Sequence, residues 1–164
     1  MSFPPLSPAP DATQERPHRY HDGRTSTLKI SQRERPYPEG RLIVSRTDLN
    51  GTITHCNEAF VEISGYTREE LIGQPHCVLR HPDIPRAVYE DLWGTLQAGN
   101  KWHGYVKNLC KDGSHYWVFA TAVPNRRGGQ VVGYSSVRRE PSRKKIAEAE
   151  ARYKDMLAAE EGSQ

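Results

Sequence analysis

Residues 42–73 have the sequence LIVSRTDLNGTITHCNEAFVEISGYTREELIG. A short apolar run at 42–45 is followed at 52–55 by a second run in which β-branched residues alternate. Asn50-Gly51 lies between the two runs, and this pair favours a tight hairpin because both residues tolerate positive φ. The stretch therefore predicts two antiparallel strands at the start of the fold.

Short helices are predicted after this hairpin. Asn57 can cap the first helix by accepting backbone N–H groups. Thr67 and Glu70 have the spacing of a capping box, which predicts a second helix start. A longer helix is expected from Arg86 to a stop at Gly99. Its apolar residues form a single stripe, which consists of Val88, Tyr89, Leu92, Trp93 and Leu96.

Three further strands are predicted at 102–109, 115–123 and 130–137. Turns separate them, and Pro124 is expected to end the middle strand. Two strands, several short helices and three more strands make an α+β fold. We expect a five-stranded antiparallel sheet with one buried face, which the short helices cover so that a pocket is enclosed.

Both ends of the chain differ in composition from residues 41–140, which we expect to form one domain. The stretch 1–38 contains seven prolines, so neither strand nor helix is expected there, and residues 1–40 are predicted to be a disordered arm. Residues 141–164 carry apolar residues at a three-to-four spacing, which predicts an amphipathic helix. The helix is too short to be stable alone, so it should pack on the domain or pair with a second copy.

The bulk composition argues against several classes of protein. With 35% hydrophobic residues and a mean hydropathy of −0.79, the 164 residues cannot all be packed core. The net charge of +3 is too small to indicate nucleic-acid binding, and Arg126 and Arg127 beside two glycines are interpreted as a solvated hairpin tip. No apolar run is long enough to span a membrane.

The cysteines and the absence of catalytic motifs narrow the function further. Cys56, Cys77 and Cys110 are odd in number and lack CxxC spacing, which argues against a disulfide framework and a zinc site and suits the reducing cytoplasm. No Ser-His-Asp, Cys-His or paired-carboxylate arrangement and no phosphate loop occurs. We therefore do not expect an enzyme.

Several blocks of sequence carry a resemblance to a known family. They are 48–51 (DLNG), 57–60 (NEAF), 64–66 (SGY), 70–73 (ELIG), 80–85 (RHPDIP), 91–93 (DLW), 102–108 (WHGYVKN), 111–113 (KDG) and 116–118 (YWV). The first four resemble PAS domains. Together the blocks span about 100 residues in one order, and they resemble the FAD-binding PAS domain of bacterial aerotaxis receptors.

This resemblance implies a cytoplasmic sensor that holds FAD non-covalently and responds to its redox state as a proxy for oxygen. Such domains signal to a chemotaxis-type output, which we expect here to be a separate protein. A homodimer through the C-terminal helix or the N-terminal arm is the other expected partner. The positions that match the family's flavin-contacting residues are Asn57, Arg80, His81, Asp83, Tyr89, Trp93, Asn108 and Tyr116.

The residue types suit that ligand. Tyr89 and Trp93 offer flat packing surface to an isoalloxazine ring. Asn108 carries a donor and an acceptor, which match the polar edge of the ring, and Asn57 could do the same. Arg80 and His81 can contact the pyrophosphate or adenine side, with Asp83 orienting one of them. A neighbouring amide such as that of Asn108 would have to rearrange when the redox state of the ring changes.

Purely structural roles remain open for the same residues. Tyr89 and Trp93 could simply be core residues of a helix. Asn57 could be only a helix cap, and Arg80 with Asp83 could be a surface ion pair of little energetic value.

Rival functions also remain open. Blue-light receptors of the LOV type place an adduct-forming cysteine three residues after a glycine, but His76 occupies that place after Gly73, and Cys77 is about 100° further round a helix. A flavin photoreceptor without an adduct and a haem-binding domain with His81 or His103 as the ligand are further alternatives. So is an empty module that only dimerises. A metal site from His76, Cys77 and His81 lacks a recognised ligand spacing.

Overall fold

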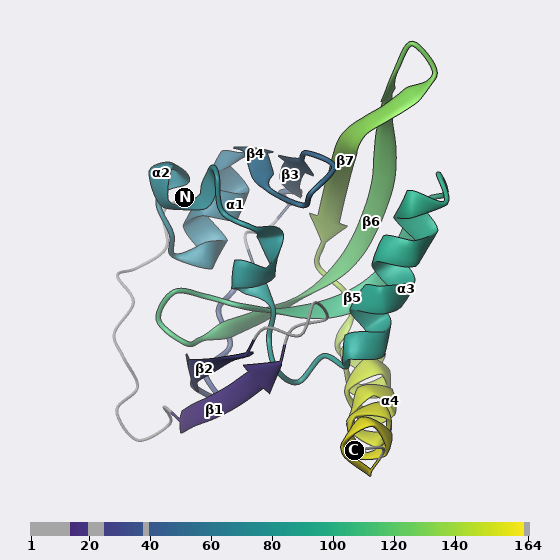
Figure 1. Cartoon of the computed structure of the whole chain (residues 1–164). Helices are drawn as coiled ribbons and strands as arrows, with labels where there is room; N and C mark the ends of the chain where they lie inside the picture. Colours follow the sequence, from purple (N-terminus) through teal and green to yellow (C-terminus); the bar gives the residue numbers. More distant parts are fainter. Residues whose placement is uncertain (1–13, 20–24, 38–39, 163–164) are drawn as a thin grey trace.

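The structure is a computed structural model that describes residues 14–19, 25–37 and 40–162. Its centre is a five-stranded antiparallel sheet in the order β4-β3-β7-β6-β5 (Figure 1). The strands are β3 (Ile43–Thr47), β4 (Ile53–Cys56), β5 (Trp102–Leu109), β6 (His115–Arg127) and β7 (Gln130–Arg139). The predicted α+β fold is confirmed, and the helices between β4 and β5 lie over one face of the sheet (Figure 1).

The three α-helices between β4 and β5 begin where the sequence indicates, and a 3-10 helix that the sequence did not indicate lies between the second and the third. They are α1 (Glu58–Ser64), α2 (Arg68–Leu71), the 3-10 helix η1 (His76–Leu79) and α3 (Arg86–Gln97). The Asn57 side chain accepts a hydrogen bond from the N–H of Phe60 and caps α1, as predicted. Thr67 and Glu70 form both bonds of the predicted capping box at α2. Gly65, with φ of 78°, ends α1 in a left-handed conformation that favours glycine.

The core lies between the helices and the covered face of the sheet. Its side chains that are at most 1% exposed include Ile43, Ile53, Phe60, Ile63 and Leu71. Burying an apolar side chain of this size contributes about 1.5–3 kcal/mol. The apolar stripe of α3 turns towards the same layer, and Val88, Tyr89 and Leu96 are buried there. This packing fixes α3 above the sheet.

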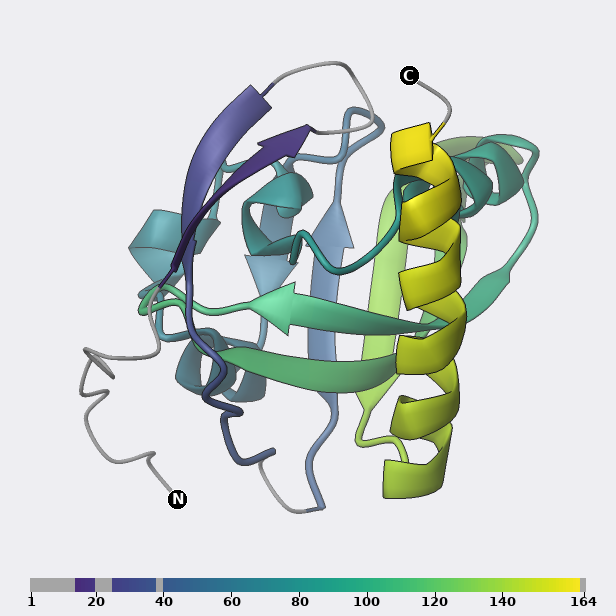
Figure 2. The same cartoon turned by 90° about the horizontal axis from the view of Figure 1, so that it is seen from below.

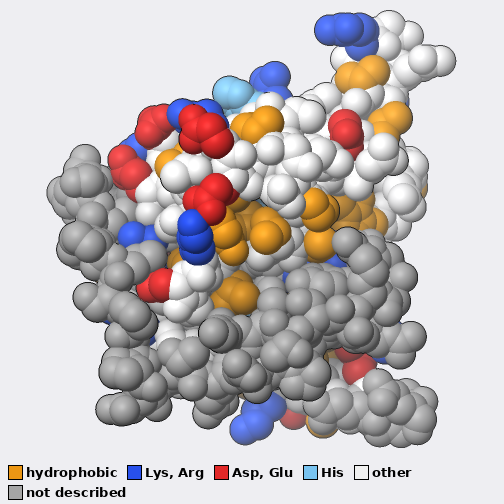
Figure 3. Space-filling model, turned by 60° about the vertical axis from the view of Figure 1, so that its left-hand side comes forward, with side chains coloured by type: hydrophobic (Ala, Val, Ile, Leu, Met, Phe, Trp, Pro, Cys, Tyr) orange, Lys and Arg blue, Asp and Glu red, His pale blue; other side chains and the backbone are white. Residues whose placement is uncertain are grey.

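The middle strand β6 is longer than predicted, because Pro124 does not end it. β6 pairs with β5 only as far as Ala122, but it continues to pair with β7 through Pro124 and on to Arg127. From Val123 onward one edge of β6 is unpaired, so the missing N–H of a proline is tolerated there. The resulting β6–β7 hairpin projects from the body of the domain (Figure 1). Basic side chains mark its tip, as expected for a solvated turn (Figure 3).

The expectation that the N-terminal arm contains no strand was wrong. β1 (Gln14–Arg19) and β2 (Thr25–Ile30) pair as a separate two-stranded antiparallel sheet. Pro17 stands opposite Thr27 in it. Each strand of a two-stranded sheet keeps one edge unpaired, and proline is accommodated at such edges.

The segment 30–37 packs against the domain. Ile30 is 1% exposed. The N–H of Arg35 donates to the carbonyl of His115 at 2.7 Å, and the Arg35 guanidinium donates to the carbonyl of Ile63 at 3.1 Å. The hydroxyl of Tyr37 donates to the carbonyl of Arg138 at 2.8 Å. Part of the predicted arm therefore belongs to the packed structure.

The C-terminal helix α4 (Arg143–Gly162) packs on the domain, which was the first of the two expected possibilities (Figure 2). Ile146, Ala149 and Tyr153 on its narrow apolar stripe are buried. The ring of Tyr153 stacks on Trp117 of β6, and its hydroxyl donates to the carbonyl of Tyr105 of β5 at 2.6 Å. Among the described residues, no helix is both long and apolar enough to cross a membrane.

Candidate functional site

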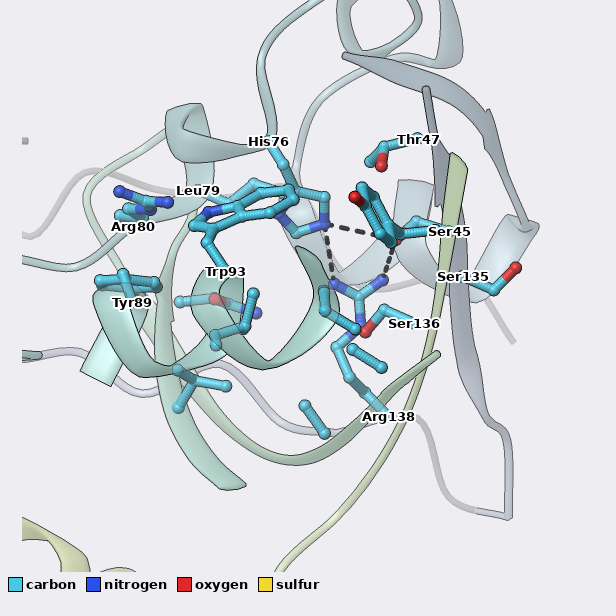
Figure 4. Close-up of a pocket in the computed structure, with 17 residues that line it drawn as sticks. Ser45, Thr47, His76, Leu79, Arg80, Tyr89, Trp93, Ser135, Ser136 and Arg138 are labelled. Carbon is cyan, nitrogen blue, oxygen red and sulfur yellow. Dashed lines mark hydrogen bonds between the residues drawn. The ribbon is translucent and has the colours of Figure 1, made fainter. Parts of the chain in front are cut away.

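A cleft lies between α3, η1 and the covered face of the sheet (Figure 4). Its empty volume, the open mouth included, is about 670 Å³. Leucines, alanines and Val106 form much of its wall. Its polar and aromatic lining consists of Ser45, Thr47, His76, Arg80, Tyr89, Trp93, Asn108, Tyr134, Ser135, Ser136 and Arg138. A mainly apolar cleft with a few polar groups is the usual form of a small-molecule site.

One wall of the cleft is aromatic. Tyr89 and Trp93 reach it from α3, where a spacing of four residues places them on one side of the helix. The Trp93 ring meets the ring of Tyr134 edge-on at 5.5 Å between centroids. The guanidinium carbon of Arg80 lies 3.9 Å from the centre of the Tyr89 ring. This wall offers flat apolar surface with a cation at one end.

The opposite side of the cleft holds a polar triangle of Ser45, His76 and Arg138 (Figure 4). The Arg138 guanidinium donates to Oγ of Ser45 at 2.7 Å, and another of its nitrogens lies 3.2 Å from Nε2 of His76. Oγ of Ser45 and Nε2 of His76 are 3.3 Å apart. The triangle therefore joins β3, η1 and β7 at the cleft.

The electrostatics of the triangle are unusual, because its histidine is neutral. Burial, with the positive charges of Arg138 and Arg80, lowers the pKa of His76 from 6.5 to about 3. At neutral pH the Nε2 atom can therefore accept a hydrogen bond from Arg138. Burial also lowers the pKa of Arg138, but an arginine keeps its proton at any ordinary pH.

Arg138 is a buried cation without a paired anion. Its side chain is 2% exposed, and within the described ranges it forms no ion pair with a carboxylate. Burying a charge is costly unless a partner compensates it. A guanidinium at the wall of a cleft therefore favours a ligand that brings electron-rich oxygen or nitrogen atoms.

Three polar atoms of cleft residues point to the same conclusion. Nε1 of Trp93 and Nε of Arg138 are buried and make no hydrogen bond to any part of the chain that the structure describes, and buried Nδ2 of Asn108 has only the hydroxyl of Tyr116 beside it. Buried donors of this kind almost always have a partner in folded proteins. All three are N–H donors, so an occupant of the cleft should present acceptors.

The structure brings four of the eight predicted site residues together at the cleft. Arg80, Tyr89, Trp93 and Asn108 all line it. Arg80 and Asn108 are also joined through a backbone bridge between the end of η1 and β5. The helix stripe that carries Tyr89 and Trp93 thus has a second role besides core packing.

Asn57 does not reach the cleft. Its Oδ1 accepts hydrogen bonds from the N–H groups of Phe60 and Val44, both at 3.1 Å, and its Nδ2 donates to the carbonyl of Leu42 at 2.9 Å. The amide is therefore occupied with holding α1 to the start of β3, which is the purely structural role that the sequence left open.

The other three predicted residues lie near the cleft but outside its lining. His81 is 1% exposed, and its Nδ1 accepts from the N–H of Asp83 at 3.0 Å. Asp83 forms an ion pair with Lys107 of β5 at 2.9 Å. Tyr116 is fully buried beside Asn108 in the strand register, and burial raises the pKa of its hydroxyl. These three residues therefore lie behind the wall of the cleft and do not face its interior.

Sequence reasoning missed Ser45, His76, Tyr134 and Arg138. The sequence of β7 contains a pattern that could have predicted some of these residues. Tyr134, Ser136 and Arg138 alternate along the strand and so share one face. That face is the one covered by helices, so polar residues on it indicate a site. His76 gives a weaker signal, because its place depends on the turn of η1.

The positions of His76 and Cys77 bear on the photoreceptor alternative. His76 lines the cleft, whereas Cys77 of the same 3-10 turn does not. This is the arrangement that the sequence predicts from the one-residue offset. The described residues also contain no group of three histidine, cysteine or acidic side chains that could hold a metal ion.

Comparison with known proteins identifies the family. A family model of the PAS fold matches residues 53–138, which is more than half of the chain, and the chain belongs to this family. The match spans β4 to β7 and so includes most of the cleft.

Individual relatives place the chain more closely. The aerotaxis receptor of Escherichia coli (strain K12) is 46% identical over 129 residues, which are 79% of this chain and 26% of the receptor. The chain thus spans about a quarter of the length of that receptor.

Solved structures support the fold. The PAS domain of a protein from Colwellia psychrerythraea has a TM-score of 0.52 at 29% identity, over 61% of this chain and 86% of that chain. The light-state structure of the blue-light photoreceptor Aureochrome1 LOV has a TM-score of 0.58 at 17% identity, over 73% of this chain and 91% of that chain. At this low identity the second likeness shows the fold alone.

Proposed function

We propose that the chain binds FAD non-covalently in this cleft and reports the redox state of the flavin to a separate signalling protein of the chemotaxis type. The observation that carries the proposal is the group of buried N–H donors in the cleft, in which Nε1 of Trp93 and Nε of Arg138 have no partner among the described residues and the Arg138 cation faces no carboxylate. The similarity to an aerotaxis receptor supports the same ligand class.

The cleft suits an isoalloxazine ring in shape and in polarity. Tyr89 and Trp93 can pack against the flat apolar faces of the ring. The ring edge carries carbonyl oxygens and ring nitrogens, which are the acceptors that the Asn108 amide and the Arg138 guanidinium lack. Arg80 places a second positive charge at the other end of the aromatic wall, which would attract a more distant anionic group of the ligand.

The bound flavin would supply a centre that accepts and releases electrons. Arg138 would keep a fixed positive charge beside it, and neutral His76 would hold the guanidinium in place as an acceptor. Because Arg138 also bonds Ser45, a change of charge in the cleft would act on β3, β7 and η1 together. The Asn108 amide, which contains both a donor and an acceptor, can reorient when the ring edge changes.

The signalling role is proposed from the family and from the similarity to a receptor. Oγ of Ser45 and Nε2 of His76 lie 3.3 Å apart in the cleft, and Arg138 contacts both, so we assign this pair to ligand binding and not to turnover. The proposed sensor is cytoplasmic. A homodimer through α4 would have to use a surface other than Ile146, Ala149 and Tyr153, which are buried against the domain.

Replacement of Asn108 tests the site. Asn108→Ala should lower the flavin-to-protein ratio after purification by about five- to tenfold, because a hydrogen bond of about 1 kcal/mol and cleft packing are lost. Asn100→Ala, an exposed residue after α3, is the matched control and should keep the wild-type ratio. Flavin released by heat is identified by chromatography, which also separates FAD from FMN. Equal flavin content in both variants would remove Asn108 from the site.

A further inference from the structure

The chain contains three tryptophans, and the structure gives each of them a different environment. Trp93 lines the cleft, and its side chain is half-buried. Trp102 is buried on β5 outside the cleft lining, and its Nε1 donates to the carboxylate of Asp91 at 2.8 Å. Trp117 of β6 stacks on Tyr153 of α4 and does not line the cleft either. Of the three, Trp93 alone is placed to contact an occupant of the cleft.

The chemistry of the cleft favours Trp93 over the tyrosines as a source of electrons. An indole can lose one electron and hold the charge over its two rings, whereas a phenol gives up its proton on oxidation and needs a base beside it. Tyr89 and Tyr134 line the cleft, but the lining that the structure describes contains no carboxylate. His76 is a weak base there, because burial and two arginines lower its pKa to about 3. An electron therefore leaves Trp93 more readily.

We propose that Trp93 is the electron donor of a light-driven reaction: blue light absorbed in the cleft makes one electron pass from the Trp93 indole to the flavin. This inference rests on the proposed function for the identity of the acceptor. The step oxidises the indole by one electron to a radical cation and delivers that electron to the ligand, and no bond is made or broken. Nε1 of Trp93 has no hydrogen-bond partner among the described residues, so the oxidised indole keeps its proton and takes the electron back.

A second contact surface of Trp93 allows the lost electron to be replaced. Trp93 also lines a hollow at the surface of the molecule, where Leu49, Glu90 and Gln97 are among its neighbours. The empty volume of this hollow, its open side included, is about 1060 Å³, which admits a small thiolate. A thiolate that reduces the oxidised indole is left as a thiyl radical, and the electron delivered to the cleft then stays there. With a thiol present and oxygen absent, light therefore drives net reduction.

A wall residue without this role would behave differently. If Trp93 only packs against the ligand, its replacement changes how tightly flavin is held but does not change how long an absorbed photon remains stored in it. Electron transfer from Trp93 instead shortens the lifetime of flavin fluorescence, because it competes with emission. The lifetime separates the two roles, since it is measured on bound flavin whatever the affinity.

The experiment uses the whole chain saturated with FAD and three substitutions of one kind. Trp93→Phe keeps a flat apolar ring that is much harder to oxidise, and Trp102→Phe and Trp117→Phe are matched controls outside the cleft lining. The fluorescence lifetime of bound FAD and the transient absorption of the indole radical cation are measured after a blue laser pulse. Reduction under continuous blue light is followed by visible absorption, with and without dithiothreitol, in the absence of oxygen.

In the wild type and in both controls we expect a short lifetime, an indole radical signal that decays as the electron returns, and lasting bleaching only with the thiol. In Trp93→Phe the lifetime should be several-fold longer, the radical signal should be absent, and reduction under light should be several-fold slower. These differences follow because only Trp93 among the three tryptophans lines the cleft.

A second protein covers the case in which Trp93→Phe does not hold FAD. It carries Trp102→Phe and Trp117→Phe together, so that Trp93 is its one tryptophan. Grown with fluorotryptophan, it keeps the shape of the indole but makes the ring harder to oxidise. Its bound FAD should have a longer lifetime than in the same protein grown with ordinary tryptophan. Equal lifetimes in these two preparations would show that Trp93 is not the donor.

The outcomes distinguish this inference from the proposed function. Bound FAD with the same short lifetime in Trp93→Phe and in the wild type overturns the inference and leaves the flavin site standing. A lifetime that lengthens in Trp117→Phe and not in Trp93→Phe also overturns it, because the donor then lies outside the cleft. A protein that neither retains nor binds flavin contradicts the proposed function, and the inference falls with it.

Discussion

Arg138 and His76 determine the chemistry of the cleft at the scale of single residues. A buried guanidinium usually faces a carboxylate, but here its described partners are a hydroxyl, a neutral imidazole and the ring of Phe60, whose centre lies 4.6 Å from the guanidinium carbon. His76 stays neutral because burial and two arginines oppose its protonation. The pair thus keeps one positive charge at the wall, which the proposed ligand would compensate.

The depressed pKa of His76 predicts a pH dependence of stability. Below pH 6.5 the unfolded chain takes up a proton that folded His76 refuses until pH about 3. The unfolded state therefore binds more protons in this window, and the free energy of unfolding falls as pH falls, by up to about 1.4 kcal/mol per pH unit from this group. The stability that neutral His76 contributes is fully present above pH 6.5 and is lost as the pH falls towards 3. Urea unfolding at pH 7, 6, 5 and 4 measures this loss.

His76→Gln should flatten that dependence, since the amide keeps an acceptor for Arg138 but does not titrate. His55→Gln, on the exposed side of β4, should retain the wild-type slope. His115, whose pKa burial lowers to about 4, contributes the same sign in all three proteins and cancels in the comparison. Identical slopes for His76→Gln and the wild type would show that His76 does not carry the effect.

Sequence patterns could predict only part of the site. Tyr89 and Trp93 were predicted from a helix stripe together with the family resemblance, and Asn108 from the resemblance alone; all three line the cleft. Asn57 was misplaced because a capping asparagine and a ligand-binding asparagine have the same local sequence. Arg138 could not be placed by type alone, since arginine is normally exposed, and its burial depends on the register of β7 against β3.

At the scale of elements, local signals predicted the helix starts and most strands correctly, because caps and turns act over a few residues. Pro124 was misjudged because whether a proline ends a strand depends on which neighbour pairs with it. β5 stops short of this position, and that is a property of the sheet and not of the local sequence.

The docking of α4 should depend on the hydroxyl of Tyr153. Tyr153→Phe removes the hydrogen bond to the Tyr105 carbonyl, which should lower the free energy of unfolding by about 1 kcal/mol. The stacking on Trp117 remains in this variant. Urea unfolding measures the loss. An unchanged midpoint would mean that this hydrogen bond contributes nothing to the docking of α4.

At the scale of the whole molecule, the packed structure begins before residue 41, the predicted start of the domain. Residues 30–37 bond to β6, to β7 and to the end of α1, so a domain that starts at residue 41 lacks part of its packing. Composition could not show this, because a proline-rich segment can still pack if its few apolar and charged side chains find partners.

A chain that begins at residue 41 should be less stable than the whole chain. It loses at least three hydrogen bonds and the burial of Ile30, which together contribute roughly 3–7 kcal/mol. A chain that begins at Gln14 keeps these contacts and is the control. Calorimetry or urea unfolding compares them. If the shorter chain unfolds at the same midpoint as the control, 30–37 contributes nothing to the domain.

The flavin is the central claim, and the absorption spectrum of the purified protein tests it most directly. The account predicts bands near 375 and 450 nm that bleach on addition of dithionite and return in air, as flavin redox chemistry requires. Blue light alone should not bleach the 450 nm band, because Cys77 does not line the cleft. A colourless protein that gains no such bands with added FAD, or a haem-like band near 400 nm, would contradict the account.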